Sequence, residues 1–242
     1  MTLTIPELRQ LCDERAVPLP ALREAATATD GAPVYAGEVA GVDAFRLWCA
    51  LRDLHGHTGW WPVLAGDPEE LGSVLVGLRE DFGPGPAGPT QPEILSEGVT
   101  DEAVRQLAAH VAAEVDLARV GGLHVSAVRQ ARTALCLVRA PAGHEVPALL
   151  NWLGACNHDL AGTDHALVLR TYHERFGAEL VTLESDILEL LVPRRPTTPD
   201  TVARTALEHY AYCPDIVDQG VGSVEALAAT QLLAGTWHFW WD

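Results

Sequence analysis

The stretch "AELVTLESDILELLV", residues 178–192, decides the fold. Two short apolar runs flank the polar pair Ser185–Asp186, and this pattern predicts two strands joined by a tight turn. Strands joined by so short a turn run antiparallel. A purely parallel sheet is therefore excluded.

Other helices and strands are expected on both sides of this hairpin. Apolar side chains at three- and four-residue spacing, with capping residues before most of them, predict helices at 5–15, 43–55, 101–120, 163–177, 199–212 and 224–234. Short apolar or alternating runs predict strands at 32–40, 60–66, 133–140, 147–154 and 236–242. The expected fold class is α+β: a mixed β-sheet with helices packed on it, including one antiparallel hairpin (about 178–192) and a C-terminal strand.

The C-terminal strand has two chemically different faces. In "TWHFWWD", residues 236–242, successive side chains point to opposite faces of a sheet. Trp237, Phe239 and Trp241 therefore share one face, which we expect to be core. His238 and Trp240 share the other.

Residues 82–98 are rich in proline and glycine, so we expect no regular secondary structure there but a linker or a surface excursion. We expect a single α+β domain over residues 1–242, with residues 67–130 as an insertion or linker plus a long helix.

The composition indicates a globular cytoplasmic protein. The chain has 242 residues, of which 48% are hydrophobic, enough for a sizeable core. It contains no apolar run of the roughly 18 residues that span a membrane, and its start lacks the pattern of a secretory signal. The five cysteines are dispersed without CxxC spacing, as expected of reduced thiols.

The net charge of the chain indicates which classes of binding partner to expect. Acidic residues number 33 against 16 basic ones, and the net charge is −17. A field of this sign repels nucleic acid and anionic membranes, so neither is expected as a partner. It favours a basic protein as partner, although an acidic proteome would give the same composition.

No cofactor is expected. The chain has no GxGxxG after a predicted strand, no phosphate-binding loop and no GxSxG turn. A small-molecule ligand remains possible without such a motif.

The stretch "HYAYCPDIVDQG", residues 209–220, concentrates polar side chains at the end of a predicted helix. His209 and Cys213 share a helix face, which is the spacing of a nucleophile and its base. However, the C-terminal end of a helix disfavours a thiolate, so we interpret Cys213 as a small buried side chain.

The same stretch can also be interpreted as part of a ligand-binding pocket without catalysis. A polar pocket with an aromatic wall would suit a ligand. Its candidate ligand-binding residues are Glu208, Tyr212, Asp215, Asp218, Gln219 and Trp240. The alternative is a structural turn in which these side chains satisfy nearby backbone groups.

The segment "NHDLAGTDH", residues 157–165, holds the chain's weak metal candidates: His158, Asp159, Asp164 and His165. Their spacing fits no known zinc or iron motif, and Asp164 or Thr163 is more simply a helix cap. No tightly bound metal is expected.

Four segments in order carry a family resemblance: "TGWWPVLAG", "FGAELVTLESDILEL", "YAYCPDIVDQG" and "WHFWWD". Together they resemble the bacterial domain-of-unknown-function family numbered 4253, over about the last 110 residues and the Trp-Pro segment near residue 60. The resemblance implies a soluble bacterial protein with residues 131–242 as the family-like core. It also implies that the Trp-Pro strand belongs to the same domain.

Two classes of function remain open. The first is a non-catalytic binding or interaction protein, of the kind that acidic immunity proteins and antitoxins exemplify, with an acidic surface for a basic partner. The alternative is an enzyme of unrecognised type, with a polar pocket around Tyr212, Asp215 and Asp218 or a metal at His158 and His165.

Overall fold

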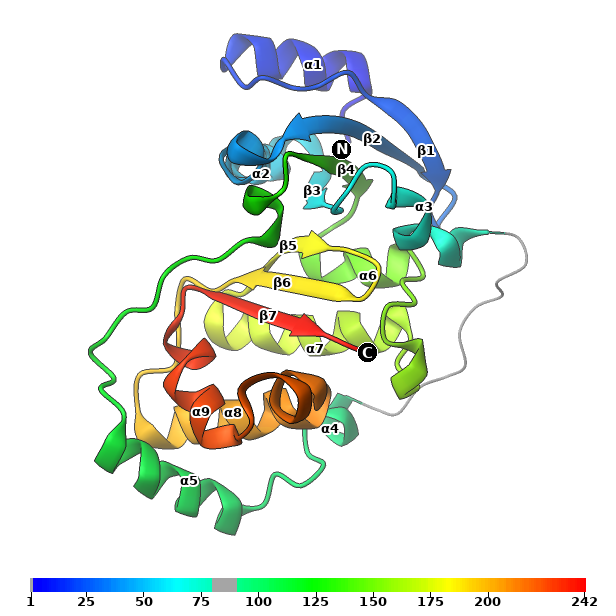
Figure 1. Cartoon of the computed structure of the whole chain (residues 1–242). Helices are drawn as coiled ribbons and strands as arrows, with labels where there is room; N and C mark the ends of the chain where they lie inside the picture. The colour runs from blue at the N-terminus through cyan, green and yellow to red at the C-terminus, as the bar shows by residue number, and fades with distance from the viewer. Residues whose placement is uncertain (1, 80–90) are drawn as a thin grey trace.

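The computed structural model describes residues 2–79 and 91–242, whose strands form one mixed sheet in the order β1-β2-β4-β3-β5-β6-β7 (Figure 1). The strands are β1 (Arg23–Thr27), β2 (Pro33–Ala40), β3 (Trp60–Leu64), β4 (Arg132–Arg139), β5 (Glu179–Leu183), β6 (Ile187–Leu191) and β7 (Thr236–Trp240). The α-helices are α1 (Ile5–Glu14), α2 (Gly41–Thr58), α3 (Leu71–Val74), α4 (Gln91–Ile94), α5 (Asp101–Glu114), α6 (Val146–Leu149), α7 (Gly162–Phe176), α8 (Pro199–Tyr212) and α9 (Val224–Ala229). The predicted α+β class is confirmed.

The strand pairing explains why the sheet is mixed. β5 and β6 pair antiparallel around the Ser185–Asp186 turn, and β6 pairs antiparallel with β7, so the predicted hairpin and C-terminal strand are confirmed. β3 pairs with β5 in parallel, through Leu64 and Thr182. That parallel pairing joins the N-terminal strands to the C-terminal hairpin. The single sheet therefore contains strands from both sides of residues 67–130.

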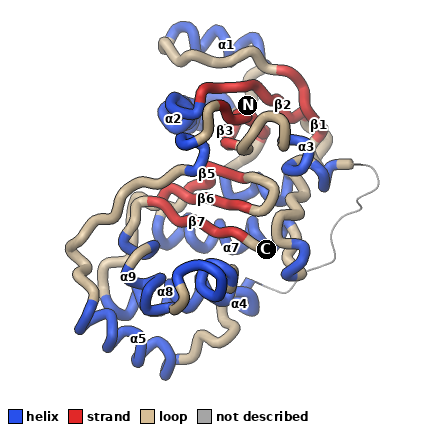
Figure 2. Tube along the Cα trace, in the orientation of Figure 1, coloured by secondary structure: helices blue, strands red, loops and turns tan. Residues whose placement is uncertain are grey.

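Helices cover one face of the β5-β6-β7 half, which we call the inner face (Figure 2). The ring of Tyr172 on α7 lies 5.3 Å from that of Trp237, and the His209 ring on α8 lies 4.9 Å from that of Phe239. Trp237 and Phe239 are 0% exposed and Trp241 is 2% exposed. The prediction that this face of the C-terminal strand is core is confirmed. Packing of large rings in edge-to-face contact contributes beyond the area buried.

Local capping signals place the N-terminal ends of four helices where the sequence predicts them, whereas α5 ends at Glu114 and not at the predicted residue 120. Thr4, Thr100, Thr198 and Ser223 each accept a hydrogen bond from a backbone N–H in the first turn of α1, α5, α8 and α9. Gly177 ends α7 with a φ of 64°, a left-handed conformation that glycine adopts without a steric penalty.

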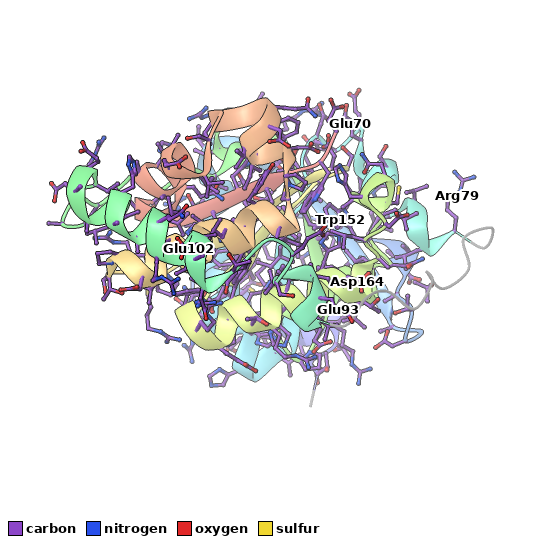
Figure 3. The ribbon with its side chains drawn as sticks, turned by 90° about the horizontal axis from the view of Figure 1, so that it is seen from below. Glu70, Arg79, Glu93, Glu102, Trp152 and Asp164 are labelled. Atoms are coloured by element: carbon purple, nitrogen blue, oxygen red, sulfur yellow. The ribbon has the colours of Figure 1, made fainter. Side chains whose placement is uncertain are left out.

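The strand predicted at 147–154 is wrong. Pro147 lies in the first turn of the short helix α6, where a backbone N–H would have no partner within the helix, so proline is tolerated. Asn151 then turns the chain with a φ of 43°. Trp152 then enters the core rather than a strand, with its indole N–H donating to the Glu184 carbonyl at 2.7 Å. Figure 3 shows Trp152 within the body of the molecule. A short apolar run does not by itself separate a strand from a buried helix.

Three smaller differences concern element boundaries. β1 (Arg23–Thr27) is an edge strand that no alternation pattern in the sequence predicts. The last helix ends at Ala229 rather than residue 234, and a 3₁₀ turn, η6 (Gln231–Leu233), follows it. Most of the predicted linker at 82–98 lies outside the described residues, but its end contains the helix α4, so the expectation of no regular structure is wrong there.

No helix within residues 2–79 and 91–242 combines the length and the apolar character needed to cross a membrane.

Candidate ligand site on the outer face of the sheet

The outer face of β7, opposite α7 and α8, carries the other side chains of the C-terminal strand. His238 and Trp240 are half-buried there, in contrast to the buried rings of the inner face. They form the floor of a hollow of about 440 Å³. Its walls come from η6 and the end of α9, from the π-helix η5 (Ile216–Val221), and from residues 119–124.

Residues 115–131, which we call the connecting segment, lead from α5 up one side of the molecule to β4 (Figure 1). Gly121 N–H donates to the Leu233 carbonyl at 2.8 Å, and His124 N–H donates to Thr236 Oγ1 at 2.9 Å. A Cβ on Gly121 would lie 2.8 Å from Ala234 Cα, so this close approach requires glycine. These contacts hold the connecting segment as a wall of the hollow.

A buried carboxylate orients the histidine on the floor. His238 Nδ1 lies 3.1 Å from Glu189 Oε1, and Glu189 on β6 is only 3% exposed. Both oxygens of Glu189 also accept the Ser126 backbone N–H, at 3.1 Å each. Burial alone would raise the pKa of Glu189, but the hydrogen bonds and the charge of His238 lower the pKa below its ordinary value. Glu189 is therefore ionised, and it keeps Nδ1 of His238 as a donor.

A second carboxyl group extends this network. Ser126 Oγ lies 3.0 Å from Glu189 Oε2 and 3.1 Å from Glu184 Oε1. One hydroxyl has one proton to donate, so both contacts are hydrogen bonds only if one carboxyl is protonated. Burial raises the pKa of Glu184, while the pKa of Glu189 is lowered. Of the two carboxyl groups, Glu184 is therefore the one that takes up a proton first as pH falls, and the contacts run from Glu184 through Ser126 to ionised Glu189 and His238.

The stretch 209–220 forms the end of α8 and then the π-helix η5, a rare form that is frequent at functional sites. Ile216 and Gly220 from this stretch line the hollow. Asp215 connects the stretch 209–220 to Asp242 and to His158. Its Oδ2 lies 3.0 Å from His158 Nε2 and accepts the Asp242 N–H at 2.9 Å. Part of the stretch therefore forms a structural junction, and part of it borders the hollow.

The six predicted ligand-binding residues lie in different surroundings. Trp240 lines the hollow. Glu208 forms an ion pair with Arg175 at 2.7 Å on the side of α8 near α7. Tyr212 is 1% exposed, with its hydroxyl 2.5 Å from His165 Nδ1. Gln219 donates to Asp215 at 3.2 Å, and exposed Asp218 accepts from the Tyr210 hydroxyl at 3.1 Å. Ligand binding by the set stays a prediction.

Cys213 and His209 belong to the core. The Cys213 thiol donates to the Trp240 carbonyl at 3.0 Å, and burial raises its pKa to about 12. Burial lowers the pKa of His209 to about 3. At neutral pH the pair is an uncharged thiol and an uncharged imidazole, which is not the state of an activated nucleophile.

The four weak metal candidates do not converge. Asp164 caps α7 by accepting the Ala161 N–H at 2.8 Å, inside the body of the molecule (Figure 3). His165 is buried against Tyr212, and burial lowers its pKa to about 3. His158 contacts Asp215, and Asp159 turns the chain with a φ of 57°. Within the described ranges, no three histidine, cysteine or carboxylate side chains are placed to hold a metal ion.

Sequence reasoning missed Glu184, Glu189, Ser126 and His238 as a group. One signal was present: Glu189 interrupts the apolar run "ILELL" of a strand predicted to be buried. A charged residue at such a position is rarely buried without a partner. The partners come from residues 126 and 238, so the sequence pattern alone does not name them.

A second hollow of about 650 Å³ lies between the end of α1 and the start of α2. Its charged side chains include Arg46 and Asp43, which pair with each other at 2.8 Å and are 78% and 54% exposed. The outer-face hollow differs because a buried, ionised carboxylate supports its floor. We therefore regard the outer-face hollow as the candidate site.

The fold and the site define an α+β protein with one mixed sheet and a hollow over its C-terminal strand. The model of the family described as "Domain of unknown function (DUF4253)" matches residues 134–242, from β4 to the C-terminus. This match confirms the resemblance predicted for the C-terminal half. No curated protein and no solved structure matches the chain.

Proposed function

We propose that this protein is a non-catalytic binding protein and that it takes a small molecule in the outer-face hollow. The observation that carries the proposal is the floor of that hollow, where Trp240 and His238 are half-exposed while the inner-face rings of the same strand are buried. Ligand sites combine apolar walls with a few fixed polar groups, and volumes of roughly 300–1,000 Å³ are typical. The volume of about 440 Å³ fits a small ligand.

The chemistry around the hollow supports binding rather than catalysis. An activated serine needs a hydrogen bond to a base that accepts its proton. Ser126 Oγ instead contacts Glu184 and Glu189, and the lowered pKa of Glu189 makes it a weak base. Glu189 thus acts as an anchor for Ser126 and His238.

The test is a binding measurement with a neutral aromatic probe, 1-naphthylmethanol, by calorimetry and by NMR shifts of labelled protein. Ala229 lines the hollow, so Ala229→Phe fills it. We expect this variant to weaken binding at least about tenfold. Ala112→Phe, at an exposed position of α5, is the matched control and leaves binding unchanged. Equal affinity of the probe for both variants, or NMR shifts confined to residues outside the hollow, would refute the proposal that the hollow binds the ligand.

A second candidate, an acid–base enzyme, is favoured by the contact between His238 and Glu189. A carboxylate that holds an imidazole in one tautomer is a recurrent device of general-base catalysis. Incubating the protein with a small-molecule extract of the native host, followed by mass analysis, separates the two candidates. Conversion of the ligand that His238→Gln abolishes, with binding retained, would favour the enzyme.

The net charge of −17 supports interaction with a basic protein as a further role, and this remains a prediction. An affinity pull-down from the native host at low and high salt tests it. A basic partner that is captured at low salt and released at high salt is the expected result.

A further inference from the structure

We infer that the ligand of the outer-face hollow is a small organic anion with an apolar body. This inference rests on the proposed function and names the class of ligand. The anionic group would lie toward Arg119, His124 and His238. The apolar body would lie against Trp240.

The charge of the lining is the first support. Among the residues that the structure describes, those that line the hollow include Arg119, His124 and His238, but no aspartate or glutamate. The whole chain has 33 acidic against 16 basic residues, so this lining reverses the balance of the molecule. The nearby carboxylate, Glu189, already accepts hydrogen bonds from Ser126 and contacts His238. A cationic ligand would face three basic side chains at the surface of the hollow. It would find no carboxylate among the lining residues with which to form an ion pair, so the lining disfavours a cation.

Arg119 supplies a fork of donors for the anionic group. Its side chain is exposed, and within the described part of the chain it forms no ion pair or hydrogen bond. A guanidinium binds a carboxylate through two parallel hydrogen bonds, a geometry that an ammonium group does not provide. His238 adds a fixed nitrogen, because its Nδ1 is engaged by Glu189 and Nε2 is the nitrogen left for a ligand; Nε2 donates to an anion in the imidazolium form of the ring.

The rim of the hollow supplies the apolar part of the recognition. Five large apolar side chains are exposed in the described residues. Three of them, Val120, Leu123 and Val221, are 70%, 57% and 42% exposed and come from the two segments that border the hollow. Exposed apolar groups gathered at one place mark a binding surface, whereas scattered ones need no explanation. Together with Trp240 they favour a ligand that is more than a bare inorganic anion.

Three probes of nearly equal shape test the charge preference: 1-naphthylacetate, 1-naphthylmethanol and 1-naphthylmethylammonium. Calorimetry gives their affinities at pH 7 and moderate salt. We expect the anion to bind about tenfold more tightly than the neutral probe, and the cation more weakly than either.

Arg119→Gln should abolish most of the preference for the anion while leaving the affinity for 1-naphthylmethanol unchanged. Arg129→Gln is the matched control, since Arg129 is also exposed on the connecting segment but does not line the hollow. Both substitutions lie at exposed positions, and the melting temperature of each variant checks that the fold is retained.

The outcomes separate the two proposals. If the neutral or the cationic probe binds as tightly as the anion, or if Arg119→Gln leaves the preference intact, the inference about the anion is overturned and the proposed function stands. If none of the probes binds in the hollow, both are overturned.

Discussion

Glu189→Gln is the most informative single change, because the carboxylate is 3% exposed and joins two parts of the chain. The substitution keeps the shape of the side chain but replaces one acceptor oxygen by an NH₂ donor. That donor then faces the Ser126 N–H and hydroxyl, or His238 Nδ1, all of which lie within 3.1 Å of the present oxygens. At least one of these donors loses its charged acceptor, and the His238 imidazole avoids that loss only by moving its proton to Nε2.

The expected loss follows from those contacts. An unsatisfied buried donor costs about 1–3 kcal/mol, and a hydrogen bond to a charged group contributes about 1.5–3 kcal/mol. We therefore expect the free energy of unfolding to fall by about 3 kcal/mol. For a chain of this size, that corresponds to a decrease of roughly 6–12 °C in Tm.

Urea unfolding followed by circular dichroism measures the loss, with Glu24→Gln as the control. Glu24 also lies on a strand but is exposed, so its substitution should change the free energy of unfolding by less than about 0.5 kcal/mol. If Glu189→Gln and Glu24→Gln lose equally little, the Ser126–Glu189–His238 network does not stabilise the fold as argued.

The pH dependence provides a second check on Glu189. Its folded pKa is lowered below the ordinary value of 4.5. The contribution of Glu189 is therefore present above the unfolded pKa and is lost as pH falls through the folded pKa. The difference between wild type and Glu189→Gln should be full at pH 7 and should shrink below about pH 4.5. A difference that grows in acid would contradict the assigned direction.

Three further predictions concern the core and the network. Deletion of residues 236–242 removes three core aromatics, each worth roughly 3–5 kcal/mol, so the truncated chain should show no cooperative melting transition by calorimetry. Cys213→Ser places a more polar group in a buried slot but keeps a donor for the Trp240 carbonyl; a loss of about 1–2 kcal/mol in urea unfolding is expected, and unchanged stability would mean that the slot tolerates polarity. The amide of Glu184→Gln keeps a hydrogen-bond donor at every pH. The folded pKa of the Glu184 carboxyl group is raised, so its contribution to stability is full below the unfolded pKa. That contribution is lost as pH rises through the folded pKa. The variant should gain stability relative to wild type as pH rises from about 4 to about 7, and a constant difference over that range would argue against a raised pKa of Glu184.

The misassigned segment at 147–154 shows where sequence reasoning fails. Its apolar run fits a strand as well as a buried helix, and Pro147 fits the first turn of a helix. The choice depends on Trp152, whose ring lies 4.7 Å from that of His165 and 5.7 Å from that of Trp241. These partners are distant in sequence, so no local pattern contains the information.

The sequence by itself determined the features that depend on neighbours along the chain. The turn at Ser185–Asp186, the helix caps and the alternation of the C-terminal strand follow from backbone preferences and from the two-residue period of a strand. These are interactions over a few residues, and they need no knowledge of the fold. The family resemblance of the C-terminal half likewise rests on motifs in order along the chain.

Only the tertiary structure decided which side chains meet at the candidate site. Ser126 comes from the connecting segment, Glu189 from β6 and His238 from β7, and the hollow above them exists because Gly121 lets that segment approach Ala234. The hydrogen bonds that join them span 49 to 63 residues. The physical reason is that burial and partner choice arise from packing between distant segments, whereas the sequence pattern states only which residues are polar and which are apolar.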